Sequence, residues 1–329
     1  MRAGHAVRCA LAAYLCAGPL AHAQKPGTLH GGYPARPIRI IVTISPGGGP
    51  DTVTRIAAQV LTAELGQSVV VDNRPGGGTV LATDLVANAA PDGYTLLAGT
   101  DSMMLVSAMK RVAYDTRKAF EPIVQMTSQW YVLAVTPALP VKSVKELIAY
   151  AKNKPDALTY ASQGVGTTGH LSMENFKMLT GASMLHVPYK GAAPALLDII
   201  GGQVHLMFAS TVSALPQVAS GKLRGIAITS PQRIRQQPDL PTVAESGVPG
   251  FKASNTYGLY APAGTPRPIV LGLNKVVTDG LRAPDMLKRL AAEGTEPPDP
   301  MTPDEFKAAF AKEYVLVEKL VKQINLKLY

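Results

Sequence analysis

Cysteine is almost missing from this chain of 329 residues. Only Cys9 and Cys16 occur, and both lie in the first 23 residues. That segment has early arginines, a short apolar run and an A-x-A ending, Ala21–Ala23, which is the pattern of a secretory signal peptide. We expect residues 1–23 to be removed, leaving a mature chain that starts at Gln24. Without cysteine it has no disulfides, no thiolate metal sites and no cysteine nucleophile.

Long hydrophobic runs are also missing. The apolar part of the leader spans only Cys9 to Leu20, whereas a membrane-spanning helix needs roughly 20 apolar residues. No typical lipoprotein triplet precedes either cysteine. A lipoprotein leader and an uncleaved anchor are therefore the less favoured alternatives. We expect a soluble protein in the periplasm.

Dense blocks of charge are absent, although the chain is basic. It has 32 lysines and arginines against 23 acidic residues, a net charge of +9 that falls to +7 when Arg2 and Arg8 leave with the leader. The basic residues are scattered and have no aromatic residues interleaved with them, which argues against a nucleic-acid partner. An anionic small ligand and a merely solvated basic surface both remain open.

Catalytic and metal-binding motifs are missing as well. No G-x-S-x-G elbow accompanies His170, although Ser162 and Ser172 are near it in sequence. His186 and His205 do not form an H-x₃-H or HExxH pattern. We therefore expect no catalytic residues, no metal and no cofactor. An exported hydrolase that uses Asp51 or His170 remains the weakest alternative.

Strand-like and helix-like segments alternate along the mature chain, which predicts βαβ units. Two such series follow one another, and they meet in mid-chain and again near Phe251–Tyr260. The predicted fold is α/β with two lobes, each a mostly parallel sheet flanked by helices, joined by crossover strands as in a Venus flytrap. We place lobe 1 at residues 34–130 plus 256–329 and lobe 2 at residues 131–255. Ser143 and Glu146 have the spacing of a capping box at a helix start.

A glycine-rich turn between a strand and a helix occurs once in each series. Ile44–Asp51 reads ISPGGGPD, and Ala161–His170 reads ASQGVGTTGH. The first turn lacks both the Walker A and the Rossmann pattern. Glycine lets the backbone approach a ligand closely, and a helix start offers free N–H groups and a positive dipole end. We expect both turns to face the interlobe cleft and to bind a carboxylate. Plain tight turns, the first with Asp51 as helix N-cap, are the alternative.

Aromatic residues make up only 6% of the chain, with one tryptophan. Trp130 and Tyr131 stand at the start of the mid-chain crossover. Such side chains could stack on a ligand in the cleft or simply pack in the core.

The chain resembles the Bug-type solute receptors of tripartite tricarboxylate transporters. The matching segments, in family order, are YPARPIRIIVTISPGGGPD, VVVDNRPGGGT, APDGYTLL, LTYASQGVGTTGH, HVPYKGAAPALLDIIGGQVHLMF, LPTVAESGVPGF and GLYAPAGTP. The resemblance implies a binding protein without catalysis, whose two glycine loops grip the carboxylate of a small organic acid. It implies a membrane permease as partner, and we expect a monomer. An exported sensor that feeds a signalling system is the alternative.

The ligand-binding residues expected from the loops and the resemblance come from both lobes. They are Ile44, Ser45, Pro46, Gly47, Gly48, Gly49, Asp51, Thr100, Trp130, Gly164, Val165, Gly166, Thr167, Thr168, Ala209 and Ser210.

Several positions depart from the family pattern. Ile44-Ser45-Pro46 replaces Phe-Pro-Pro, Thr256 replaces an aromatic, and Ala209 stands where an aspartate is common. Losing that acid would remove a partner for a ligand amine, and Trp130 would add an apolar surface. We therefore hypothesise a carboxylate whose distal part is uncharged, rather than aspartate or glutamate.

Overall fold

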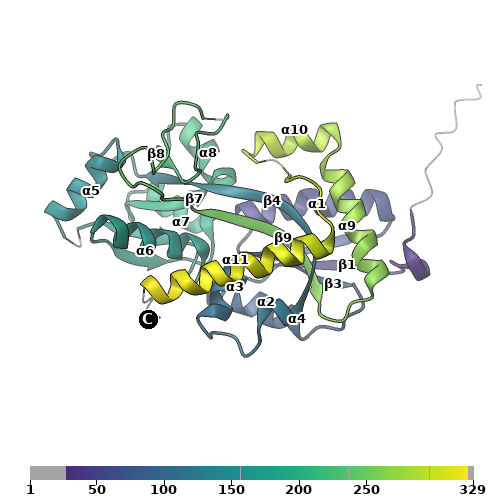
Figure 1. Ribbon diagram of the computed structural model, residues 1–329. Coiled ribbons are helices and arrows are strands. Elements are labelled where there is room, and N and C mark those ends of the chain that lie inside the picture. The colour runs from purple at the N-terminus through teal and green to yellow at the C-terminus, as the bar shows by residue number, and fades with distance from the viewer. Residues whose placement is uncertain (1–26, 156, 236, 296, 325–329) are drawn as a thin grey trace, which may run out of the picture.

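The computed structural model describes residues 27–155, 157–235, 237–295 and 297–324. The expected signal peptide, residues 1–23, lies outside the described residues. Figure 1 shows two groups of helices and strands, joined by two long strands that run side by side between them. The strand order is β2-β1-β3-β9-β4-β7-β5-β6, with β8 also paired to β4.

Lobe 1 is built on three parallel strands. β1 lies between β2 and β3, and glycine turns or short loops lead from these strands into helices. The elements are η1 (His30–Gly32), β1 (Ile38–Val42), α1 (Gly49–Leu65), β2 (Val69–Asn73), η2 (Gly77–Thr79), α2 (Val80–Ala87), β3 (Thr95–Thr100), α3 (Ser102–Ala108) and α4 (Thr116–Ala119).

Lobe 2 also has three parallel strands, with β5 between β6 and β7. The predicted capping box is confirmed at the start of its first helix: the Glu146 N–H donates to Ser143 Oγ, and the Glu146 carboxylate accepts from the Lys142 N–H. The elements are α5 (Val144–Asn153), β5 (Thr159–Ser162), α6 (Thr168–Thr180), β6 (Leu185–Pro188), α7 (Ala192–Ile200), β7 (Leu206–Ser210), α8 (Thr211–Ala219) and β8 (Arg224–Ile228).

Two antiparallel strands, β4 (Phe120–Val135) and β9 (Ser254–Pro262), connect the lobes. Phe120–Trp130 pairs with β9, and from Tyr131 onward β4 pairs with β7 and β8. β9 is also antiparallel to β3. Each lobe therefore combines a parallel trio with antiparallel crossover strands, which confirms the predicted architecture in outline and makes the sheet mixed.

Three helices follow β9: α9 (Arg267–Leu281), α10 (Pro284–Ala292) and α11 (Pro303–Ile324). Figure 1 shows α11, in yellow, crossing the front of the molecule from lobe 1 toward α6 of lobe 2. Thr302 caps α11, because its Oγ accepts from the Glu305 N–H at 3.2 Å. No helix in the described part of the chain has the length and apolar character needed to cross a membrane.

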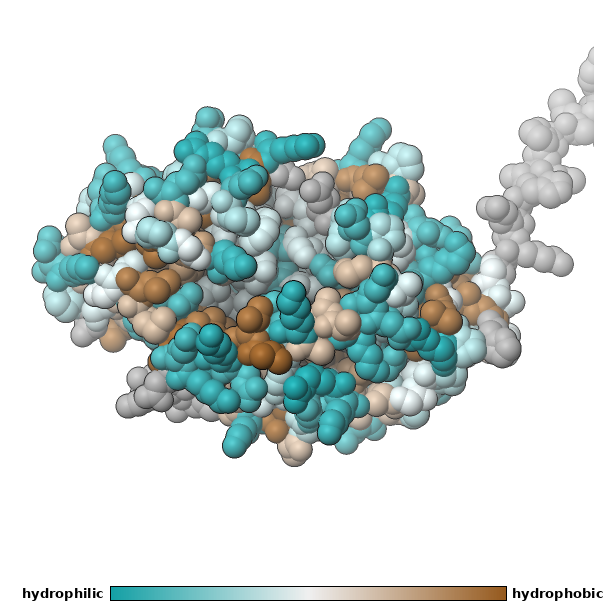
Figure 2. All heavy atoms as spheres, viewed as in Figure 1, coloured by the Kyte–Doolittle hydropathy of each residue, from teal (hydrophilic) through white to brown (hydrophobic). Residues whose placement is uncertain are grey.

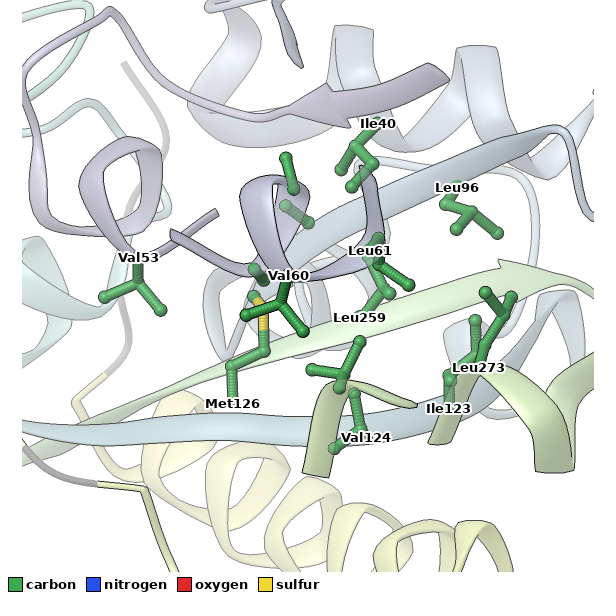
Figure 3. Close-up of a cluster of buried hydrophobic side chains, with 14 of the residues drawn as sticks. Ile40, Val53, Val60, Leu61, Leu96, Ile123, Val124, Met126, Leu259 and Leu273 are labelled. Atoms are coloured by element: carbon green, nitrogen blue, oxygen red, sulfur yellow. The ribbon is translucent and has the colours of Figure 1, made fainter. Parts of the chain in front are cut away.

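Separate apolar cores stabilise the two lobes. Figure 3 shows the largest one in lobe 1, where side chains of α1, α9 and the strands meet: Ile40, Val53, Leu61, Leu96 and Leu273 are all buried there. The second face of the same strands packs under α2, α3 and α11. Lobe 2 has two further clusters on the two faces of its strands. Because strands are covered on both faces, they read as continuous apolar runs in the sequence.

Candidate functional site

A small chamber lies between the lobes, at the carboxyl ends of the parallel strands. We call it the inner chamber. Its volume is about 20 Å³, which is room for little more than a water molecule or the head of a carboxylate. It is lined by Ile44, Gly49, Pro50, Thr79, Thr100, Ser102, Tyr131, Gln163, Thr167, Thr168, Ala192, Ser210, Asn255 and Tyr257.

Helix starts surround the inner chamber. α1, α2, α3, α6, α7 and α8 each begin at a lining residue or directly after one. The first N–H groups of a helix lack partners within the helix and carry partial positive charge. None of the lining side chains is charged. The chamber therefore offers a negative ligand group a shell of dipoles and hydroxyls without a fixed cation.

A buried carboxylate organises the first glycine loop. α1 begins at Gly49, so Asp51 is the third residue of the helix and not its N-cap, which corrects the expected role. Asp51 Oδ2 accepts from the Gly47 N–H at 2.9 Å and from Arg55 Nε at 3.0 Å, and Oδ1 accepts from Asn73 Nδ2 at 2.9 Å. Burial opposes the charge of Asp51, but the hydrogen bonds from Arg55, Gly47 and Asn73 outweigh it and lower the pKa.

Neutral groups organise the second glycine loop. Thr167 caps α6, and its hydroxyl donates to the Gly164 carbonyl at 2.8 Å. His170 Nδ1 accepts from the Gly166 N–H at 3.3 Å, and the ring stacks on His186 with centroids 4.1 Å apart. His186 Nε2 in turn lies 2.6 Å from Ser162 Oγ. Burial lowers the pKa of His170 to about 4 and that of His186 to about 3, so both rings are neutral at pH 7.

Two polar atoms at the inner chamber have no partner among the described residues, Thr79 Oγ1 and Gln163 Oε1. Thr79 also has a φ of 95°, an unusual backbone conformation for a residue with a β-branched side chain. Such strain costs roughly 1–3 kcal/mol and tends to persist at ligand sites. Both residues are thus poised to bond to a ligand or to an ordered water.

A larger outer chamber of about 270 Å³ adjoins the inner one and shares Ile44, Thr79, Gln163 and Thr167 with it. Unlike the inner chamber it has cationic side chains, Arg111 and Lys190. The other lining residues are Thr43, Gly76, Gly77, Gly78, Gly164, Val165, Pro188 and Tyr189.

The lobes are closed on each other around these chambers. The Ser45 N–H donates to the Lys190 carbonyl at 3.2 Å, and the Gly49 N–H donates to Ser213 Oγ at 3.2 Å. Arg111 Nη1 donates to the carbonyl of Val165 at 2.9 Å. Hydrogen bonds between the lobes thus surround both chambers.

Comparison with known proteins identifies the family to which this architecture belongs. The family model for "Tripartite tricarboxylate transporter family receptor" matches residues 53–326. The chain belongs to this family. The predictions of a Bug-type receptor, and of a receptor rather than an enzyme, are thereby confirmed. In the part of the chain that the structure describes, no group of three or more potential metal-ligating side chains occurs.

Several relatives cover almost the whole receptor. Protein BugT of Bordetella pertussis is 37% identical over 299 residues, spanning 90% of this chain and 91% of BugT. A solved structure of Rpa4515 from R. palustris with adipate is 35% identical, with a TM-score of 0.86, and covers 89% of this chain and 99% of that one. MatC from Rhodopseudomonas palustris with bound malate is 33% identical, with a TM-score of 0.85, covering 88% and 100%.

The structure brings together part of the expected site of the receptor. The expected residues that line the inner chamber are Ile44, Gly49, Thr100, Thr167, Thr168 and Ser210. Gly164 and Val165 line the outer chamber. The remaining loop residues line neither chamber, and one of them, Ser45, joins the lobes; they are Ser45, Pro46, Gly47, Gly48, Asp51 and Gly166.

Two expected residues lie elsewhere. Ala209 is fully buried in an apolar cluster of lobe 2, and its neighbour Ser210 faces the inner chamber instead. Trp130 lines a groove on the other side of the crossover strands, and its neighbour Tyr131 lines the inner chamber. The hypothesis of an uncharged ligand tail rested on Ala209 and Trp130, so it loses its structural basis.

Sequence reasoning missed several lining residues. Gly76-Gly77-Gly78 forms a third glycine turn, quoted above only for the resemblance, and it contributes to the outer chamber with Arg111. Asn255 and Tyr257 come from the crossover strand β9. A third glycine turn was a usable signal. Gln163 lies within the second glycine turn, so its position in that turn was also a usable signal. Nothing local marks Arg111 as a residue of the site.

Proposed function

We propose that the receptor captures a small organic carboxylate between its lobes, with the carboxylate head in the inner chamber and the rest of the ligand in the outer chamber. The observation that carries this proposal is the ring of helix starts around an uncharged inner chamber. Desolvated N–H groups and hydroxyls can replace the water lost by a carboxylate. The unpartnered Thr79 hydroxyl would add one of these hydrogen bonds.

The outer chamber favours a second acidic group on the ligand. Among the described residues Arg111 donates to the Val165 carbonyl through one nitrogen only, which leaves its other N–H groups available to an anion. Lys190 adds positive charge at the same chamber. The relatives solved with adipate and with malate hold dicarboxylates, which supports the same ligand class here. We therefore replace the uncharged-tail hypothesis with a dicarboxylate.

The assignments of compartment, partner and boundaries follow from the family and remain proposals. We propose export to the periplasm by the residue 1–23 leader, action as a monomer, and delivery of the ligand to a tripartite tricarboxylate permease. We propose residues 34–130 plus 256–329 for lobe 1 and residues 131–255 for lobe 2. The change of pairing partners on β4 between Trp130 and Tyr131 supports these limits. Sensing for a signalling system is the alternative partner role, and gene neighbourhood separates the two.

The testing experiment uses matched acids on the ligand-stripped mature protein. Adipate and hexanoate have the same number of carbons but differ by one carboxylate, and malate and glutamate extend the panel. We expect adipate or malate to raise the melting temperature by mass action, and hexanoate to raise it less. The variant Arg111→Gln should reduce the difference between the two six-carbon acids.

Two results would contradict parts of this proposal. If no carboxylate in the panel changes the melting temperature, the inner chamber is not a carboxylate site. If hexanoate binds as tightly as adipate, the outer chamber does not recognise a second carboxylate and the uncharged-tail hypothesis returns.

A further inference from the structure

Asp101 lies between the ligand chamber and a groove on the opposite side of the crossover strands. Its chain neighbours Thr100 and Ser102 line the inner chamber, whereas Asp101 itself lines the groove. The groove has a volume of about 430 Å³ and runs between α6 and the second half of α11. We call it the rear groove. Figure 2 shows apolar side chains gathered where the left end of α11 approaches α6.

The carboxyl group of Asp101 is buried and accepts few hydrogen bonds from the protein. The residue is only 7% exposed. Its Oδ2 accepts from the Thr256 N–H at 2.8 Å, while Oδ1 has no hydrogen-bond partner among the described residues. Its own N–H donates to Asn255 Oδ1, which faces the inner chamber. Thr256, through its N–H and more weakly through its hydroxyl, supplies less than a buried carboxylate needs to stay ionised.

The surroundings of Asp101 supply no compensating cation. No salt bridge of the described residues includes it. α11 contributes the acidic Glu313, β4 and β9 contribute the phenols of Tyr131, Tyr257 and Tyr260, and the one lysine at the rear groove is the exposed Lys252. α6 presents only uncharged side chains, Thr168, Leu171, Ser172 and Asn175.

Burial therefore governs the titration of Asp101. It raises the pKa of this carboxyl to about 7; the Thr256 N–H opposes the rise, the charge of Glu313 adds to it, and the Thr256 hydroxyl opposes it more weakly. In this closed structure, with no ligand in the chamber, the group is thus balanced between its two protonation states near neutral pH.

We propose that binding of a carboxylate in the inner chamber is coupled to the uptake of one proton by Asp101. This inference rests on the proposed function. A ligand carboxylate would place a negative charge against Thr100 and Ser102, the chain neighbours of a buried carboxyl group that has no ion-pair partner among the described residues. A neighbouring like charge favours the protonated form. The proton comes from solvent through the rear groove and forms one O–H bond on the Asp101 carboxyl; no other bond changes.

The sign of the pH dependence follows from linkage. Below about pH 7 Asp101 is already protonated in the free receptor, so binding takes up no proton. Above that pH a proton must bind with the ligand, so the affinity falls by up to about tenfold per pH unit. Ligand carboxylates stay ionised over this whole range and add no pH dependence of their own.

The test is calorimetry with adipate at pH 8 in two buffers of different ionisation enthalpy, with malate as the second probe. The dependence of the observed heat on the buffer gives the number of protons taken up. We expect close to one proton for the native receptor and close to none for Asp101→Asn, which should also bind with the same affinity at pH 6 and pH 8. Asp285→Asn, an exposed acid on α10, is the matched control and should behave as the native receptor does.

Glu313→Gln provides a second, milder variant if Asp101→Asn folds poorly. Removing the neighbouring charge should lower the pKa of Asp101 and move the pH dependence to lower pH, without changing the affinity at pH 5. Equal proton uptake by the native receptor and Asp101→Asn, or an affinity independent of pH between 6 and 9, would overturn the inference.

Failure of the proposed function gives a different result. If neither acid binds, the carboxylate site is in doubt, but the proton site can still be tested without ligand. The infrared difference spectrum between the native receptor and Asp101→Asn should contain the carbonyl band of a protonated carboxyl at pH 6 and lose it by pH 9. A spectrum without that band at pH 6 would overturn the proton site itself.

Discussion

The two glycine loops occupy equivalent places in the two lobes but are held by different chemistry. Charge holds the first loop, because the Asp51 carboxylate joins Gly47 to Arg55 and Asn73. Neutral hydroxyl and imidazole groups hold the second, from Thr167 to the stacked pair His170 and His186. In both arrangements the helix that follows the loop begins at the inner chamber. A glycine loop at an anion site can thus be held in place either by an ionised carboxylate or by neutral side chains.

This difference predicts that the interactions holding the two loops are lost at different pH values. The pKa of Asp51 is lowered, so its stabilisation is present above the unfolded-state pKa and is lost only as the pH falls through the folded value. The imidazoles must stay neutral, so the second loop is sensitive to much milder acid. Four experiments test this comparison, from the largest expected effect to the smallest.

Gly78→Ala should cause the largest loss, because it acts on the tip of the second loop. A Cβ at Gly78 would lie 1.8 Å from the Val165 carbonyl oxygen across the interlobe contact, at a φ of +65°. Overpacking costs about 1–3 kcal/mol or more, and every 1.4 kcal/mol is about tenfold in affinity. We expect the lobes to stay open and binding of adipate to weaken at least about a hundredfold by calorimetry.

Gly202→Ala is the matched control for this change. Gly202 has a similar φ of +72° and nothing within 4 Å of its Cβ position. It should lose a little stability and no affinity. Equal losses of affinity in both variants would show that the interlobe contact does not matter for binding.

Gly49→Ala should act on the first loop and reduce affinity by about ten- to a hundredfold, because overpacking of about 1–3 kcal/mol falls on the chamber itself. Its Cβ would lie 2.7 Å from the Tyr257 hydroxyl and 2.8 Å from Ser210 Oγ. Titration calorimetry measures the effect. Gly201→Ala, whose Cβ would lie no nearer than 3.4 Å to another atom, is the control; affinity as high in Gly49→Ala as in this control would mean that the ligand does not use the chamber.

Asp51→Asn should weaken binding by about tenfold, since a hydrogen bond to a charged group contributes roughly 1.5–3 kcal/mol and the amide retains part of it. The loss arises because the Gly47 N–H and Arg55 lose their shared acceptor. Asp72→Asn is the control, because Asp72 is ion-paired to Arg39 and Arg74 in the same lobe but lines neither chamber. If the two variants bind equally well, the carboxylate network does not organise the loop.

Mild acid should produce the smallest effect. The pKa values of His170 and His186 lie well below the ordinary histidine value, so the unfolded chain takes up protons first as the pH falls below about 6.5. The two imidazoles therefore contribute their full stabilisation above that pH and lose it as the pH falls toward 4, while protonation of Asp101 acts in the opposite direction. We expect these imidazoles to cost about 1–3 kcal/mol between pH 7 and pH 5, measured in urea unfolding as the difference between native protein and His186→Gln.

His186→Gln should reduce this loss, whereas Asp51→Asn should leave it unchanged. A loss of the same size in native protein and His186→Gln would mean that other groups cause it. Equal sensitivity of the two loops to mild acid would remove the distinction between them.

Local signals predicted most of the fold. The capping box at Ser143 and the glycine-terminated helices are decided by neighbours in the sequence, and the structure has them in place. The first half of β4 was not predicted as a strand, since Pro122 and polar residues interrupt its apolar pattern. The helix α3 was also missed, because SMMLVSA has no charged residue and is buried on nearly all sides. Its seven residues show no periodicity that separates helix from strand.

The sequence by itself determined the two glycine loops, the two βα series and the family, because these depend on residue types at short spacing. Only the tertiary structure decided which side of each crossover strand meets the ligand chamber. Neighbouring residues in a strand point to opposite faces. Tyr131 and Ser210 therefore line the chamber, while Trp130 and Ala209, one position away, face a rear groove and an apolar core. Alternation can be read from a sequence, but the packing of the lobes decides which face becomes the site.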